Sequence, residues 1–204
     1  MGHWPTLARI TSMIFDLHGN RKYLTPAERE RFINACSALP EKEQAFCLAL
    51  AFSGCRISEA LACTPGRVDR DMQALVIRSL KKRADEPIYR AVPLPSWLLD
   101  RFSRLSEGLD PHQRLWPWGR THGWKIIKRV MSAARISGMH ATPKGLRHGF
   151  GVAAVQSGVP LNLVQRWLGH AKLETTAIYT NAIGDEERAI AARLWGDVQP
   201  KQAA

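Results

Sequence analysis

The sequence predicts a mainly helical domain with one small antiparallel β-sheet, an α+β fold. Most of the chain divides into apolar segments of helical length, separated by glycine, proline or a capping residue. Two short segments with the composition of β-strands flank a polar turn, as in a β-hairpin. The chain has 204 residues, a length that suits one domain, or one domain with a small appendage.

The first helix is expected to begin after Thr25. The Thr25 side chain can accept a hydrogen bond from a free amide, Pro26 fits the first helical position, and Glu28 completes a capping box. This helix should continue to about Leu39. The next expected elements are an apolar helix over 41–53, a break at Gly54 and a short helix over 57–62.

The middle of the chain is expected to form the β-hairpin. Residues 75–80 and 88–94 have the composition of strands, and the polar stretch 81–87 between them has the composition of a turn. A loop over 111–119 should pack its segment Trp116-Pro117-Trp118 on the surface of the core. The other expected elements are helices over 95–105, 121–137, 142–157, 161–168, 174–181 and 185–195. The apolar face of the helix over 121–137 is predicted to consist of Trp124, Ile127, Val130 and Met131.

The charge of the sequence favours a polyanionic partner. Lys and Arg number 29 against 18 Asp and Glu, which gives a formal net charge of +11. No run of five like charges explains the excess, so it is spread over the fold, as in many nucleic-acid-binding proteins. Charge alone does not exclude a role in solubility or a ribosome-like electrostatic role. The apolar fraction of 45% excludes collagen and wholesale disorder.

The cysteines and the apolar stretches indicate a reducing compartment. The four cysteines show no C-x-x-C spacing, which disfavours a zinc site and favours reduced core residues. The sequence has no stretch long enough to cross a membrane and no signal peptide. We therefore expect a cytoplasmic protein with no membrane partner.

Three segments carry basic residues with alternative interpretations. Arg56 and Glu59 lie three residues apart at a helix start, and taken alone this spacing favours a structural salt bridge over catalysis. The basic turn at 81–83 suits either solvent or a DNA groove. Lys144 and Arg147 share a helix face, which fits an exposed basic surface and a bound phosphate equally well.

The order of the segments is more specific than any one of them. His170 follows a helix end at Gly169, and Tyr179 lies on the next helix; alone, they would be a loop histidine and a packing tyrosine. Together, GCRISEAL, RAVPLP, GLRHGF and LGHAKLETTAIYTN resemble motifs of the tyrosine recombinase (phage integrase) family, over about residues 22–195. The resemblance implies the catalytic-domain fold of that family.

The resemblance also implies a role for each site residue. Arg56 and Arg147 would clamp the scissile phosphate, and Tyr179 would be the nucleophile. Lys81 would protonate the leaving 5′ oxygen, with Lys82 as a second candidate.

Further residues are assigned in the same way. His170 would hydrogen-bond the phosphate, and Lys144 stands where most members of the family have histidine. Glu59 and His148 would support the cluster. Additional DNA contacts are expected from Lys82, Arg83, Arg166 and Lys172.

These residue types suit the cleavage of a DNA strand. Guanidinium groups stay protonated and bind the charge that develops on the phosphate oxygens. A phenol of pKa ~10 needs a base or a cationic field, and the 5′ alkoxide needs an acid. A phosphotyrosyl intermediate conserves the bond energy, so neither ATP nor any other cofactor is expected, and no carboxylate cluster suggests a metal.

Two departures from the family pattern affect these expectations. Lys144 would stabilise phosphate charge but is a poor base unless neighbouring charges lower its pKa. Gly149 and Gly151 stand inside a helix, where each costs about 1 kcal/mol relative to alanine, and a close backbone approach would explain them.

The resemblance implies the following organisation and partners. Residues 1–22 are expected to be an arm or linker, 23–197 the catalytic domain and 198–204 a flexible tail, with no N-terminal core-binding domain. The partner would be double-stranded DNA, on which the chain, monomeric in solution, would assemble as a tetramer, aided by DNA-bending proteins. The expected function is site-specific recombination, by integration, excision or inversion. The alternatives are a non-catalytic DNA-binding relative and a type IB-like topoisomerase.

Overall fold

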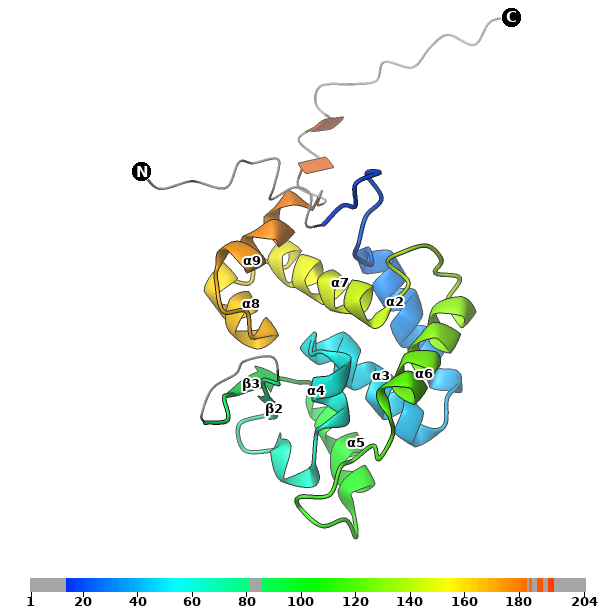
Figure 1. Ribbon diagram of the computed structural model, residues 1–204, viewed down its shortest axis with the longest axis vertical. Coiled ribbons are helices and arrows are strands. Elements are labelled where there is room, and N and C mark those ends of the chain that lie inside the picture. The colour runs from blue at the N-terminus through cyan, green and yellow to red at the C-terminus, as the bar shows by residue number, and fades with distance from the viewer. Residues whose placement is uncertain (1–13, 81–85, 183, 185–186, 189–190, 193–204) are drawn as a thin grey trace, which may run out of the picture.

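The chain folds as predicted, into a mainly helical domain with a small antiparallel sheet, which lies at one side of the molecule (Figure 1). A computed structural model describes residues 14–80, 86–182, 184, 187–188 and 191–192. The α-helices are α2 (Pro26–Ala35), α3 (Glu41–Ser53), α4 (Ile57–Leu61), α5 (Ser96–Ser106), α6 (Arg120–Ala133), α7 (Pro143–Gln156), α8 (Leu161–Leu168) and α9 (Glu174–Ala177). The 3₁₀ turns are η1 (Cys36–Ala38), η2 (Pro65–Arg67) and η3 (Ile178–Asn181). The strands are β1 (Val68–Asp69), β2 (Ala74–Arg78) and β3 (Tyr89–Pro93).

Local sequence determines the start of α2. The Thr25 hydroxyl accepts the Glu28 amide, and the Glu28 carboxylate accepts the Thr25 amide, so the predicted capping box is confirmed. The helical segment ends at Ala38, close to the predicted end near Leu39, but the α-helix itself stops at Ala35 and tightens into η1. Such a 3₁₀ turn is a common ending for an α-helix.

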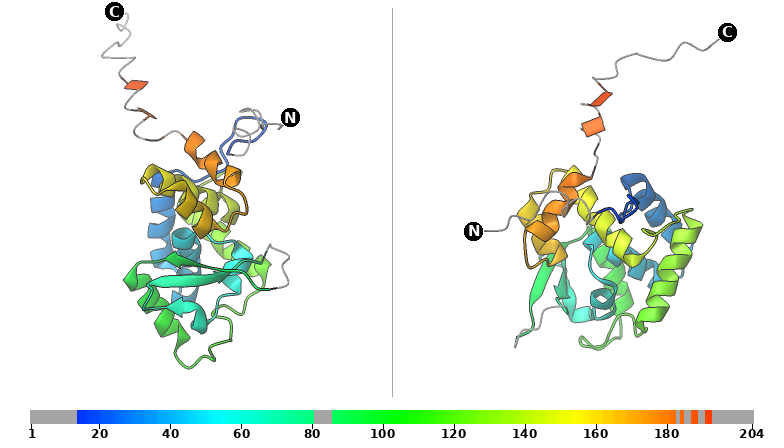
Figure 2. Two further views of the ribbon diagram at one scale, coloured as in Figure 1. Left: turned by 90° about the vertical axis from the view of Figure 1, so that its left-hand side faces the viewer. Right: turned by 45° about the horizontal axis from the view of Figure 1, so that its top comes forward.

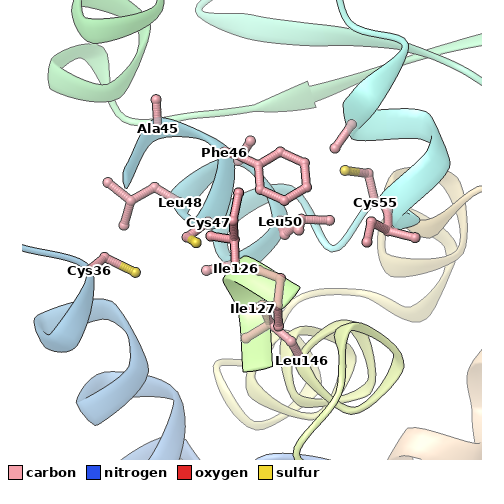
Figure 3. Close-up of a cluster of buried hydrophobic side chains, with 14 of the residues drawn as sticks. Cys36, Ala45, Phe46, Cys47, Leu48, Leu50, Cys55, Ile126, Ile127 and Leu146 are labelled. Carbon is pink, nitrogen blue, oxygen red and sulfur yellow. The ribbon is translucent and has the colours of Figure 1, made fainter. Parts of the chain in front are cut away.

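Helix α3 forms the centre of the main core. It spans the predicted residues and ends at Gly54, whose φ of +60° is left-handed. Figure 3 shows Phe46 and Cys47 of α3 among apolar side chains of α6, including Ile127. All four cysteines are buried and free, which confirms the prediction of reduced core thiols.

The sheet contains one strand that the sequence did not reveal. The described strands pair antiparallel in the order β1-β2-β3, with Leu75 opposite Val92 and Val68 opposite Leu75. Strand β1 has two residues, too few for a period-two pattern to be recognised. The predicted turn residues Lys81, Lys82 and Arg83 lie outside the described residues.

Two predictions about tryptophans were wrong. Trp116 is fully buried inside the core rather than on its surface, whereas Trp118 packs against the core as predicted. The indole N–H of Trp116 donates to the Lys42 carbonyl at 2.9 Å. Trp124 is 45% exposed, because the buried face of α6 runs through Gly123 and Ile126 instead. Helix α6 also ends at Ala133, well before the predicted 137, and left-handed Arg135 follows in the next turn.

The C-terminal elements surround a second, smaller core. In Figure 1, α8 and α9 lie together at one end of α7, and both views of Figure 2 place the sheet on the same side of the molecule as α8. The apolar residues of this core include Ile14, which is fully buried although 1–22 was expected to be an arm. The predicted helix over 174–181 is one short α-turn followed by η3. Most of the helix expected over 185–195 lies outside the described residues.

The described ranges contain neither a membrane-spanning helix nor a cluster of metal-binding side chains. No helix in them is long and apolar enough to cross a bilayer. No group of three or more His, Cys, Asp or Glu side chains in them could hold a metal ion.

Candidate active site

The structure gathers most of the predicted site residues between α4, α7 and the segment from α8 to η3. Arg56 caps α4, Arg147 and His148 lie on α7, and Tyr179 lies on η3. His170 follows Gly169, whose φ of +67° ends α8 as predicted. Lys144, on the first turn of α7, is exposed.

Tyr179 is buried against α7, with only 1% of its surface exposed. Its Oη lies 3.0 Å from Nδ1 of His148. The ring of His170 stacks on the Tyr179 ring, with the centroids 6.2 Å apart and the planes 23° from parallel. Burial raises the pKa of Tyr179 to about 12, although the charges of Arg147 and Arg56 oppose this rise. Tyr179 is therefore a neutral phenol in the free protein.

Backbone carbonyls hold Arg147 in place. Its Nη1 donates to the Gly54 carbonyl and its Nη2 to the Leu168 carbonyl, both at 2.7 Å. Each Nη carries a second hydrogen, so the guanidinium keeps further donors for an anion. Burial and the neighbouring Arg56 charge lower the pKa of Arg147 to about 10, and the group remains protonated at pH 7.

Glu59 joins two arginines in one buried network. Arg56 Nη1 donates to its Oε1 at 2.8 Å, and Arg90 Nη2 donates to its Oε2 at 2.6 Å. Burial opposes ionisation of Glu59, but the hydrogen bond and charge of Arg90, together with Arg56, hold its pKa below the usual value. The salt bridge expected at the helix start is confirmed, and the side chain of Arg56 keeps 30% of its surface exposed.

His170 and His148 are both neutral at pH 7. Burial, with Arg147 and Arg56, lowers the pKa of His170 to about 3. Burial, with the Lys144 and Arg147 charges, lowers that of His148 to about 4. Nδ1 of His170 is hydrogen-bonded at 3.0 Å to the hydroxyl of Thr176, a fully buried residue one helical turn before Tyr179.

Residues 22–185 match the sequence model of the phage integrase family. The chain belongs to the phage integrase family. The match covers the segments that carry Arg56, Arg147, His170 and Tyr179 and confirms the resemblance seen in the sequence. It identifies the described part of the chain as a catalytic domain of the tyrosine recombinase type.

Sequence relatives of this phage integrase domain include Xer recombinases. It is 31% identical over 169 residues to tyrosine recombinase XerA of Thermococcus kodakarensis, with 78% of this chain and 57% of the relative covered. It is 32% identical over 181 residues to XerD of Caulobacter vibrioides, with 80% and 58% covered. The chain thus spans little more than half the length of these relatives.

Solved structures show the same fold. The XerH recombinase bound to a palindromic difH substrate in a post-cleavage complex superposes with a TM-score of 0.71 and 24% identity, over 88% of this chain and 55% of that one. The catalytic domain of bacteriophage HP1 integrase superposes with a TM-score of 0.60 and 20% identity, over 87% and 98%. An integrase of the Tn1549 transposon, also solved with DNA, gives 0.67 and 17%, over 90% and 69%.

Arg90 and Thr176 contact the predicted site residues of this integrase domain but were not predicted. Arg90 lies within the RAVPLP segment, but a basic residue on a strand gave no sign that it would be buried. Besides Glu59, it donates to the Trp167 carbonyl at 2.7 Å and thus ties β3 to the end of α8. Thr176 resembles any helical threonine until the fold brings it to His170.

The remaining predicted DNA contacts fall into two groups. Arg166 and Lys172 lie on α8 and just after it, and both are exposed. The three basic turn residues Lys81, Lys82 and Arg83 lie outside the described part of the chain.

Proposed function

We propose that this chain is the catalytic part of a site-specific DNA recombinase that cleaves and rejoins strands through a 3′-phosphotyrosyl link at Tyr179. The observation that supports this proposal most directly is the environment of Tyr179. Its Oη lies 3.0 Å from Nδ1 of His148, and the positive charges of Arg147 and Arg56 act on it. Such a setting suits an oxygen that attacks an anionic phosphodiester. Family membership supports the same reaction.

The proposed cleavage step exchanges one phosphate ester for another. The Oη of Tyr179 forms a bond to the scissile phosphorus, the bond from phosphorus to the 5′ oxygen breaks, and that oxygen takes a proton from Lys81 or Lys82. Rejoining runs the same step backwards with a 5′ hydroxyl as nucleophile. Phosphorus keeps two ester bonds throughout, so strand exchange needs no ATP.

Arg56 and Arg147 would stabilise the charge on the nonbridging phosphate oxygens. Arg147 is fixed by two carbonyls, and Arg56 is fixed by Glu59 while part of it still faces solvent. Donors held in place before the reaction need no reorganisation as charge develops. If the hydroxyl of Thr176 donates to Nδ1 of His170, Nε2 carries the proton and is a further donor to the phosphate. Lys144 would add positive charge at the edge of the site.

The partner would be double-stranded DNA. The net charge of +11 and the exposed Arg166 and Lys172 supply contacts to phosphates. We expect four copies to assemble on paired sites, with DNA-bending proteins as accessory factors, and the protein to act in the cytoplasm on DNA of the nucleoid. Tyr179 is 1% exposed in the free domain, so DNA binding must open the site before cleavage.

A suicide substrate tests this proposal. Nicked duplexes carrying candidate sites from beside the native gene are incubated with the protein without metal or ATP, and a denaturing gel is read for covalent adducts. We expect an adduct with the wild type and none with Tyr179→Phe. Equal adduct from both proteins would refute Tyr179 as the nucleophile. In a separate assay, relaxation of supercoiled plasmid to closed circles without strand exchange would favour a topoisomerase.

A further inference from the structure

The proposed reaction leaves one proton without a described destination. Tyr179 must lose its hydroxyl proton as its oxygen bonds to phosphorus, and burial has raised the pKa of that hydroxyl. The other charged groups that act on Tyr179 are the guanidinium groups of Arg147 and Arg56. A guanidinium group has no lone pair to accept a proton. The acceptor must therefore be another group within reach of Oη.

Lys144, at the usual histidine position of the family, is poorly suited to this task. It is exposed at the first turn of α7, and no contact joins it to Tyr179 in the described part of the chain. An ammonium group carries three donors and no acceptor. Lys144 is thus suited to attract phosphate rather than to take a proton.

His148 has the required position. Its Nδ1 is the one hydrogen-bond partner of the Tyr179 hydroxyl among the described residues, at 3.0 Å. Its Nε2 is buried without a hydrogen-bond partner in the same part of the chain. If Tyr179 donates, only the Nε2–H donor is left unpaired; if His148 donates, both the phenolic hydrogen and the Nε2 lone pair are unpaired. The first arrangement leaves fewer buried polar groups unpaired, which favours the tautomer whose Nδ1 accepts from Tyr179.

We propose that His148 is a catalytic base that takes the Tyr179 hydroxyl proton in strand cleavage and returns it in rejoining. As the bond from Oη to phosphorus forms, the phenolic O–H bond breaks and the proton passes to Nδ1, which leaves an imidazolium. In rejoining, the departing Tyr179 oxygen recovers this proton while the 5′ oxygen bonds to phosphorus. This inference rests on the proposed function.

The electrostatic surroundings of His148 agree with that role. The groups that face or act on it are Tyr179, Lys22, Lys144, Arg147 and His170. Burial, followed by the charges of the nearby cations, keeps the ring neutral at pH 7 and able to accept. A phosphate anion at the arginines would raise the pKa of His148, so proton transfer would be coupled to the arrival of DNA. His148 follows Arg147 directly on α7, which places the base beside a phosphate ligand.

The test uses His148→Asn, since asparagine can place an amide atom near the Nδ1 position and hydrogen-bond Tyr179 but cannot take its proton. The substrate is the nicked duplex with a 5′-bridging phosphorothiolate at the cleavage site. Its sulfur leaves without protonation by an acid, so the pH profile of cleavage reports only on the removal of the Tyr179 proton. Matched controls are wild type and His112→Asn, which changes an exposed histidine. Thermal unfolding checks that each variant is folded, and His148→Ala with added imidazole serves as a second variant.

We expect His148→Asn to lower the single-turnover cleavage rate by about 10²–10³-fold, within the usual range for a general base. The wild-type rate should be flat between about pH 6 and 9, whereas the variant rate should rise about tenfold per pH unit as hydroxide replaces the base. Imidazole should restore part of the activity of His148→Ala. A variant rate within about threefold of the wild type with the same flat profile would overturn the inference and leave the proposed function intact. Absence of any wild-type adduct would overturn both.

Discussion

Gly151 lies directly beneath the ring of Tyr179. A Cβ atom built on Gly151 would come within 2.5 Å of Cε2 and 2.7 Å of Cζ of that ring. Gly149, one residue before Phe150, similarly approaches the Leu24 backbone, where a Cβ would lie 2.8 Å from the carbonyl oxygen. The close backbone approach expected from these glycines is therefore confirmed, and it offsets their unfavourable helix propensity.

Gly151→Ala should displace the Tyr179 ring from His148. Alanine favours the helix by about 1 kcal/mol, but overpacking of a filled site typically costs about 1–3 kcal/mol. We expect unchanged or slightly reduced stability together with a loss of cleavage of about tenfold or more, because small displacements in an active site are costly. Single-turnover adduct formation and thermal unfolding measure the two effects. Normal cleavage by a stable Gly151→Ala protein would show that the ring position is not critical.

Glu59→Gln should destabilise the fold strongly. The substitution leaves Arg90, whose side chain is 4% exposed, without its charged partner. Removing one member of a buried ion pair typically costs about 3–5 kcal/mol. The matched control is Asp100→Asn, which breaks the exposed pair with Arg70 and should cost at most about 1 kcal/mol. Urea unfolding compares the two, and equal losses would contradict a structural role for the Glu59 network.

The neutral histidines should make the domain less stable in mild acid. The folded-state pKa values are about 4 for His148 and about 3 for His170, both below the value of about 6.5 in an unfolded chain. The unfolded state therefore binds more protons below pH 6.5, and the free energy of unfolding falls as pH falls from there toward 4. Two protons give a slope of up to about 2.7 kcal/mol per pH unit.

Urea unfolding between pH 4.5 and 7.5 measures this slope. The His148→Asn/His170→Asn double variant should show a much shallower dependence over the same range. An equally steep loss in the double variant would assign the acid sensitivity to other groups.

DNA binding should depend steeply on salt, and the exposed cations on α8 and just after it should contribute to that dependence. Removing one cation that binds a DNA phosphate reduces the slope of log K against log salt by about 0.9. We expect Arg166→Ala and Lys172→Ala each to show this reduction in fluorescence-anisotropy titrations. Arg104→Ala, which removes the same charge from α5 beside Glu41, is the control and should leave the slope unchanged. A slope that changes equally in all three variants would indicate a general effect of net charge.

Features of the fold that depend on neighbouring residues were predictable from the sequence. Thr25 and Glu28 cap α2 through bonds three residues apart, and Gly54 and Gly169 end helices in the left-handed conformation they adopt readily. The sequence also named in advance most of the residues that the structure gathers between α4, α7 and η3, because their order along the chain matches a family pattern. His148 was expected only to support the cluster, since no spacing rule places residues 31 positions apart in contact.

Features that depend on distant parts of the chain were not predictable. Trp116 is buried because Phe46 and Phe102 enclose it edge-on, and both are far from it in sequence. Trp124 has the apolarity of a core residue, but the helix register turns it outward. Arg90 is buried because Glu59 and Trp167 meet it from other elements, and a charged residue is expected in water without such partners.

The central claim is that Tyr179 becomes linked to a 3′ phosphate, and peptide mapping of the adduct tests it most directly. The chain has three tyrosines, at 23, 89 and 179, and trypsin releases Tyr179 on the peptide 173–188, which contains neither of the others. After nuclease trimming, mass spectrometry should find a nucleotide on Tyr179 within this peptide, and the released DNA end should carry a free 5′ hydroxyl. A nucleotide on Tyr23 or Tyr89, or a 5′-linked adduct, would contradict the account.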